Sequence, residues 1–197
     1  MTNKNTDMEH INSVLDFWFG NEFEHQFPPK NKIAFWFQDK DLADKKIKAQ
    51  FFDLTNKALE GKLSHWLDKP KGRLALIILL DQFTRSCFRN TEKAFAGDKM
   101  ALKLCLDGIK KNDNKGLIAC ELVFFHMPLE RSEDIKDQER IVEWSSKYLK
   151  KCDQDVAKNF EQFYHWVILR YNIIKEFGRF PWRNNILGRK SNGKELE

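Results

Sequence analysis

Proline placement constrains this sequence more than any other single feature. Proline lacks a backbone N–H and clashes with the preceding helical turn, so it usually stands outside helices. All five prolines of the 197-residue chain lie between stretches of helical periodicity, and none interrupts one. They are Pro28, Pro29, Pro70, Pro128 and Pro181. Their positions predict helices separated by short connections.

Glycines support the same division, because Gly20, Gly61 and Gly178 each follow an amphipathic stretch, where helices commonly end on a left-handed residue. Long helices are expected at about 7–19, 41–60, 92–111, 117–126, 132–151 and 155–177, with shorter pieces at 33–37 and 65–67. The expected N-terminal caps are Thr6, within a capping box with Glu9, then Thr91 and Ser132.

The stretch 74–80 is apolar at every position. Its composition also suits a buried strand, but no Gly or Pro interrupts the chain from Arg73 to Ala96, which favours a helix. A helix that is apolar all round is expected at the centre of the core. No β-hairpin signature is present, and the expected helices follow one another with short connections. The sequence therefore predicts an all-α fold of antiparallel helical hairpins.

Length and composition predict one all-α domain over residues 1–197, in which 177–197 is a C-terminal tail that folds back. The chain is 42% hydrophobic and 13% aromatic, which suffices for a core without a disulfide or a metal. A weak internal match between 52–59 and 95–102 points to a degenerate helical-hairpin repeat, although the strict tetratricopeptide consensus is absent.

The four cysteines lie in apolar stretches, and no two are within four residues of each other. They are Cys87, Cys105, Cys120 and Cys152. This pattern is typical of reduced core thiols, so we expect a cytoplasmic protein with no metal and no cofactor. The longest apolar run has seven residues, whereas a membrane span needs about 20. Segment 1–9 does not resemble a signal peptide.

The first candidate site lies in the central helix. Asp81, Arg85 and Arg89 are spaced four apart, so a regular helix would place them on one face, with Gln82 beside them. Charged groups there need partners or a cavity. The pattern fits a functional cleft. It fits equally a structural role, in which two residues four apart form an ion pair and the remaining arginine caps a neighbouring helix.

Two further segments carry candidate residues. Glu133 lies at the start of the helix 132–151, where a role in stabilising the helix dipole is the favoured interpretation. The segment 177–189 combines aromatic residues with Arg179, Arg183 and Asn184. Its arginines suit a carboxylate or phosphate ligand, or they fix the tail by pairing with an acid such as Asp81 or Glu133. Both interpretations bring the three segments together.

Four motifs resemble one bacterial family, the domain of unknown function 924. They are 14–20 (VLDFWFG), 79–89 (LLDQFTRSCFR), 127–134 (MPLERSED) and 177–189 (FGRFPWRNNILGR). The resemblance covers nearly the whole chain and implies a tetratricopeptide-like all-α fold, without an activity, a cofactor or a substrate. It also implies histidine where this chain has Arg131, Arg170 and Trp182, so an arginine-rich site would replace a histidine cluster.

The leading hypothesis is a helical binding module whose groove holds an anionic small molecule or an acidic peptide or protein. The alternative is an enzyme that acts on an anionic substrate with Asp81 or Glu133 as acid or base. RNA binding is disfavoured because the 29 acidic residues leave no broad basic stripe. The candidate ligand-binding residues are Asp81, Gln82, Arg85, Arg89, Glu133, Arg179, Arg183 and Asn184.

Overall fold

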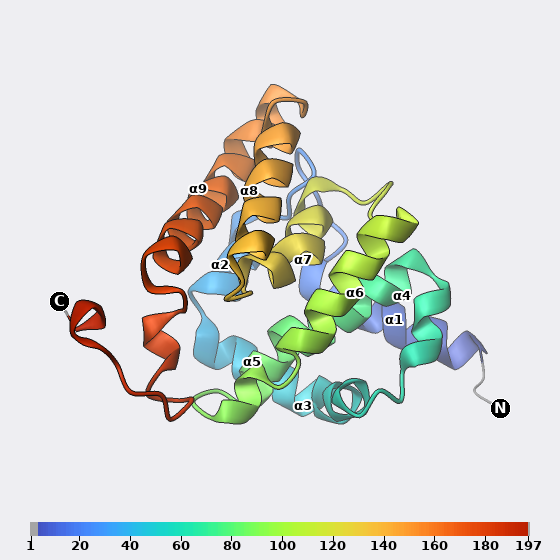
Figure 1. Cartoon of the computed structure of the whole chain (residues 1–197). Helices are drawn as coiled ribbons and strands as arrows, with labels where there is room; N and C mark the ends of the chain where they lie inside the picture. Colours follow the sequence, from blue (N-terminus) through green and yellow to red (C-terminus); the bar gives the residue numbers. More distant parts are fainter. Residues whose placement is uncertain (1–3, 197) are drawn as a thin grey trace.

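The computed structural model of the protein describes residues 4–196 and is built from helices (Figure 1). The α-helices are α1 (Lys4–Phe19), α2 (Lys30–Phe37), α3 (Lys40–Leu59), α4 (Pro70–Ile77), α5 (Thr84–Cys87), α6 (Asp98–Lys111), α7 (Ala119–Glu130), α8 (Ile135–Leu149) and α9 (Gln154–Phe177). Short 3-10 helices are η1 (Ser64–Asp68), η3 (Glu92–Phe95), η4 (Pro181–Arg183) and η5 (Gly193–Glu195), while η2 (Ile78–Phe83) is π-helical.

Between residues 4 and 196, the only strand-like pairing is an isolated bridge from Glu24 to Phe27, so the predicted all-α class is confirmed. The tetratricopeptide-like repeat and the single domain stay predictions, and the predicted domain ends at residues 1 and 197 lie outside the described residues. None of the helices in the described part is long and apolar enough to cross a membrane.

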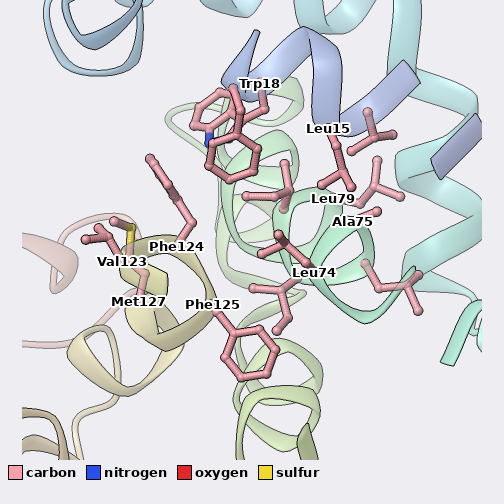
Figure 2. Close-up of a cluster of buried hydrophobic side chains, with 14 of the residues drawn as sticks. Leu15, Trp18, Leu74, Ala75, Leu79, Val123, Phe124, Phe125 and Met127 are labelled. Atoms are coloured by element: carbon pink, nitrogen blue, oxygen red, sulfur yellow. The ribbon is translucent and has the colours of Figure 1, made fainter. Parts of the chain in front are cut away.

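Two segments form the centre of the molecule, namely α7 and the stretch 74–81, which spans the end of α4 and the start of η2. Every residue of both is buried. Figure 2 shows side chains from α1, α4, η2 and α7 meeting around Trp18, Leu74, Leu79 and Phe124. The rings of Trp18 and Phe124 meet edge to face, with centroids 5.3 Å apart. The central position predicted for 74–80 is therefore confirmed, and α7 shares it because it is also apolar on every side.

Helices α8 and α9 form an antiparallel pair that lies side by side along its length (Figure 1). Gly20, Gly61 and Gly178 each follow a helix with positive φ angles of 78°, 72° and 70°, as predicted. Helices α4, α6, α8 and α9 and the π-helical η2 all pack against α7, so the elements that carry Asp81, Asp98 and Arg170 surround one buried helix.

Two of the three predicted N-terminal caps are wrong. Helix α1 begins before Thr6, which therefore lies inside it. Thr91 does stand at the N-cap of η3, but its side chain makes no capping hydrogen bond. At α8 the cap is Asp134 instead of Ser132, and its carboxylate accepts the N–H of Lys136 at 2.9 Å. Several oxygen-bearing side chains stand near each helix start, so the sequence does not decide which one occupies the cap.

Pro128 corrects the inference from proline placement, because it lies inside α7 and the helix continues to Glu130. The lost backbone N–H costs one hydrogen bond, which the complete burial of this apolar helix outweighs. The amide of Gln138 then donates to the carbonyls of Glu130 at 2.9 Å and Ser132 at 2.7 Å. This side chain from α8 therefore satisfies the carbonyls at the end of α7.

The predicted helix 92–111 is broken between η3 and α6. Gly97 lies so close to η2 that a Cβ atom there would stand 2.2 Å from the carbonyl oxygen of Leu80. Only glycine permits this approach of two backbones. The contact ends η3 and starts α6 at Asp98, directly beside the charged side of the central helix.

Candidate functional site

Asp81 is a carboxylate almost completely buried in η2, with a side-chain exposure of 1%. Its Oδ2 accepts the Nε–H of Arg131 at 3.0 Å, and its Oδ1 lies 3.4 Å from Nη2 of Arg85. The amide of Gln82 also contacts it. Burial raises the pKa of Asp81, but the charges of Arg131 and Arg85 outweigh burial, so the pKa lies below its ordinary value and the group is ionised.

Asp98 is the second carboxylate of the site, placed there by the close contact of Gly97 with η2. It accepts a hydrogen bond of 2.7 Å from Nη2 of Arg85 and lies 3.6 Å from Nη1 of Arg183. Burial raises its pKa, and the positive charge of Arg85 opposes that rise. Arg85 therefore bridges two carboxylates that come from different helices.

Arg183 enters the site from η4, in the segment that follows α9. Its Nη2 donates to the carbonyl of Arg131 at 3.0 Å. The guanidinium stands over the ring of Phe180 at 4.6 Å and over that of Phe95 at 5.1 Å. Burial lowers the pKa of Arg183 to about 10, and the charge of Arg85 contributes to this shift. The aromatic faces compensate part of the lost hydration of the guanidinium.

Arg170 of α9 forms an ion pair with Glu130, whose side chain is 1% exposed. Oε2 of Glu130 is buried and has no hydrogen-bond partner among the described residues. Burial lowers the pKa of Arg170, which also responds to the charges of Asp81 and Arg85. Arg170 therefore belongs to the same electrostatic site.

We call Arg85, Arg131, Arg170 and Arg183 the arginine cluster. Four guanidinium groups stand against three carboxylates, those of Asp81, Asp98 and Glu130, which leaves a surplus of one positive charge. Within residues 4–196, the buried Nε atoms of Arg85 and Arg183 have no hydrogen-bond partner. The cluster thus carries a surplus of positive charge and two buried N–H donors that the described residues leave unused.

The structure brings four predicted site residues together: Asp81, Gln82, Arg85 and Arg183. Arg89 does not join them, because α5 ends at Cys87 and the chain then turns. Its guanidinium pairs with Asp44 of α3 instead. The prediction assumed one regular helix, whereas the π-helical turn and the early end of α5 change the spacing.

The other predicted residues form a separate network in the tail. Arg179 pairs with Glu195 at 2.6 Å, and the amide of Asn184 donates to the same carboxylate at 3.3 Å. The hydrogen bond from Arg179 lowers the pKa of Glu195 to about 2. Arg179 and Asn184 therefore fix the tail to itself.

Glu133 holds the tail to the start of α8. It accepts 2.6 Å and 3.1 Å hydrogen bonds from Arg189 and a 2.8 Å bond from the N–H of Phe180. Burial raises the pKa of Glu133, but the hydrogen bonds from Arg189 and Phe180 lower it by more. The pKa therefore lies below its ordinary value. Because Glu133 is paired with Arg189, the two add no net charge to the arginine cluster nearby.

Sequence reasoning missed Asp98 and Glu130 as members of the site. Asp98 stands in a segment read only as helix, and Glu130 stands in the motif 127–134 without having been singled out. Only their contacts with distant arginines reveal them. Arg131 and Arg170 were singled out as departures from a family histidine pattern, and both lie in the cluster. Trp182 stacks on Phe180 with ring centroids 4.7 Å apart and is half exposed.

No group of three or more His, Cys, Asp or Glu side chains that could hold a metal occurs in residues 4–196. The four cysteines are free thiols, and Cys152 alone among them is only half-buried. Burial raises the pKa of Cys105 and Cys120, which keeps these two thiols protonated. The cytoplasmic location stays a prediction.

Comparisons with known proteins agree with the fold and supply no activity. The family model described as bacterial protein of unknown function (DUF924) matches residues 14–197. A solved structure of a protein of unknown function from Agrobacterium tumefaciens is similar, with a TM-score of 0.80 and 28% identity, over 96% of each chain. The search of curated proteins gave no match.

Proposed function

The chain belongs to the DUF924 family of bacterial proteins of unknown function, and from this premise we propose that it is a binding protein for an anionic group. The arginine cluster holds that group. One observation carries the proposal, namely the surplus of guanidinium over carboxylate at a largely buried site. An uncompensated buried charge is costly, and a bound anion removes that cost.

The cluster is partly accessible from solvent. The side chains of Arg85, Arg131 and Arg170 are 15%, 19% and 25% exposed and that of Asp98 is 21% exposed, whereas Asp81 and Glu130 are each 1% exposed. An incoming ligand therefore meets guanidinium groups together with one carboxylate, that of Asp98. Planar arginine forks suit a carboxylate or a phosphate, as found on a small metabolite or on an acidic peptide.

The test is a titration of the protein with inorganic phosphate, with citrate and with an acidic peptide that has a free C-terminal carboxylate. Calorimetry measures binding, and thermal unfolding measures the stabilisation. A ligand at 100 times its dissociation constant stabilises the fold by about 2.7 kcal/mol. We expect at least one anion to raise the melting temperature of the wild type. Arg131→Gln and Arg183→Gln should abolish this rise.

Two arginines outside the cluster provide matched controls. Arg89→Gln and Arg179→Gln remove the same charge from the networks of Asp44 and Glu195, and both variants should bind as the wild type does. The proposal is wrong if no anion shifts the melting temperature, or if all four variants lose affinity equally through general loss of charge.

A second candidate, an enzyme that acts on an anionic substrate, is favoured by one observation. Burial raises the pKa of Asp98, and a carboxylate shifted in this direction beside Arg85 suits a general acid. Asp81 and Glu133 suit that role less, because their pKa values are lowered. NMR of the anion incubated with the protein shows whether it is converted. An enzyme is identified if the wild type converts the anion, whereas Asp98→Asn binds it without converting it.

A further inference from the structure

A pocket of about 740 Å³ lies away from the arginine cluster, between the end of α1, the start of α2 and the first half of α3. This volume falls within the range of small-molecule sites. Its apolar walls come from Phe17, Phe19, Phe35 and Leu42. A pocket of about 320 Å³ adjoins it and shares Phe19, Gly20 and Asn21. Hydrophobic surface is therefore combined here with a defined concave shape.

Two lysines stand over one aromatic ring of this pocket. The Nζ of Lys32 is 5.5 Å from the centroid of Phe35, and that of Lys46 is 5.9 Å from the same centroid. Lys32 Nζ donates to the carbonyl of Phe17 at 2.8 Å, at the last turn of α1. This bond fixes the ammonium group at the wall and leaves its other N–H donors available.

Gly20 lies beside Lys32. It follows α1 with a φ of +78°, and a Cβ atom there would stand 3.4 Å from Cε of Lys32, an ordinary van der Waals contact. The left-handed conformation favours glycine at this position. The lysine stem therefore lies directly against the backbone of the α1 terminus.

Neither lysine has a carboxylate partner in the described part of the chain. Glu22 and Asp39 also line the pocket, but neither forms an ion pair with Lys32 or Lys46. Burial lowers the pKa of Lys32, and the positive charge of Lys46 lowers it further. A partly buried and an exposed ammonium group thus stand over one ring without a carboxylate partner, and an anion between them would relieve their repulsion.

We propose that this pocket is a second binding site, which takes an organic anion with an apolar body. Lys32 and Lys46 hold the acid group, while Phe17, Phe19 and Leu42 contact the body. The site shares no residue with the arginine cluster and does not depend on the function proposed for it. It differs in chemistry too, since its charged groups are ammonium groups, whereas those of the arginine cluster are guanidinium groups and carboxylates.

The probe for this site is the fluorescent dye 1-anilinonaphthalene-8-sulfonate, which has a sulfonate on an aromatic body, with uncharged N-phenyl-1-naphthylamine as its comparison. We expect the folded protein to bind the sulfonate with one site per chain. Lys32→Met and Lys46→Met should each weaken it about tenfold, the loss of one charge-assisted hydrogen bond. The uncharged dye should bind with equal affinity to the wild type and both variants.

Three further variants separate this site from folding defects and from the arginine cluster. Lys32→Arg keeps the charge and should retain dye binding, which excludes misfolding as the cause of the loss in Lys32→Met. Lys103→Met, in an exposed ion pair with Asp107, and Arg131→Gln should bind the dye as the wild type does. The proposal is overturned if both pocket variants keep wild-type affinity, or if the uncharged dye binds the wild type as tightly as the sulfonate.

Discussion

Arg131 donates its Nε–H to the buried carboxylate of Asp81 at 3.0 Å, across a separation of 50 residues in the chain. The bond connects the π-helical turn η2 with the loop that follows α7. Arg85 approaches the other oxygen of the same carboxylate. Asp81 is thus the fixed point around which arginines from separate elements are arranged, and its removal tests the whole arrangement.

Asp81→Asn should lower the free energy of unfolding by about 3 kcal/mol, because it removes a buried carboxylate and leaves two partly buried guanidinium groups without their shared counter-charge. Urea denaturation measures the difference. Lys147→Gln, which breaks an exposed pair with Glu143, should leave the midpoint unchanged within error. A midpoint for Asp81→Asn equal to that of the wild type would show that the carboxylate contributes nothing to the fold.

Acid should weaken the protein through His126, which is buried and stacks on Trp144 with ring centroids 3.6 Å apart. Burial lowers its pKa from 6.5 to about 4. The folded state therefore binds fewer protons than the unfolded state between these values, and stability falls as the pH drops from 6.5 to 4. The loss amounts to about 3 kcal/mol.

The variant His126→Phe keeps the ring stack and removes the proton, so its unfolding free energy should depend less on pH over this range. Chemical denaturation at several pH values measures the slope. Replacement of the exposed His165 by Gln should leave the slope of the wild type intact. Equal slopes for His126→Phe and the wild type would contradict this assignment.

Phe180 and Trp182 are stacked neighbours with opposite burial, since Phe180 is 0% exposed and Trp182 is 55% exposed. Phe180→Ala should destabilise the fold by about 3 kcal/mol through the cavity it leaves. Trp182→Ala should change stability by no more than about 0.5 kcal/mol. Thermal unfolding of the two variants compares them directly, and similar losses would mean that the tail is not packed as described.

Gly97→Ala should destabilise the protein by about 1–3 kcal/mol, because the added methyl group meets the carbonyl oxygen of Leu80 at 2.2 Å. The φ of Gly97 is −86°, which alanine adopts freely, so the cost is purely steric. Gly193→Ala is the matched control, because nothing lies within 4 Å of its Cβ position. If Gly97→Ala were as stable as the wild type, α6 would have to move away from Leu80 without loss of stability, and the predicted steric effect would be wrong.

Much of the fold follows from local sequence. The left-handed φ angles of Gly20, Gly61 and Gly178 and the burial of 74–80 agree with simple rules for helix ends and periodicity. Pro128 shows where such rules stop. A proline excludes a helix only when local energetics dominate, and the burial of α7 on every side overrides that local cost.

The candidate site is less predictable, for a physical reason. The spacing of Asp81 and Arg85 identifies a charged face, and that part of the prediction agrees with the structure. Asp98 and Glu130 join it through contacts between helices that no local pattern encodes. Arg89 leaves it because one turn of π-helix and an early helix end rotate the chain, and neither has a strong sequence signal.

The position of Arg183 in the chain has a consequence for the order of assembly. Synthesis runs from the N-terminus, and Arg183 comes later than every other member of the arginine cluster. The segments that carry Asp81, Asp98 and Arg131 can therefore begin to fold while Arg183 is still being added. A nascent chain can thus form the part of its core that precedes α9 before it has a complete cluster, so the proposed binding capacity arises late in translation.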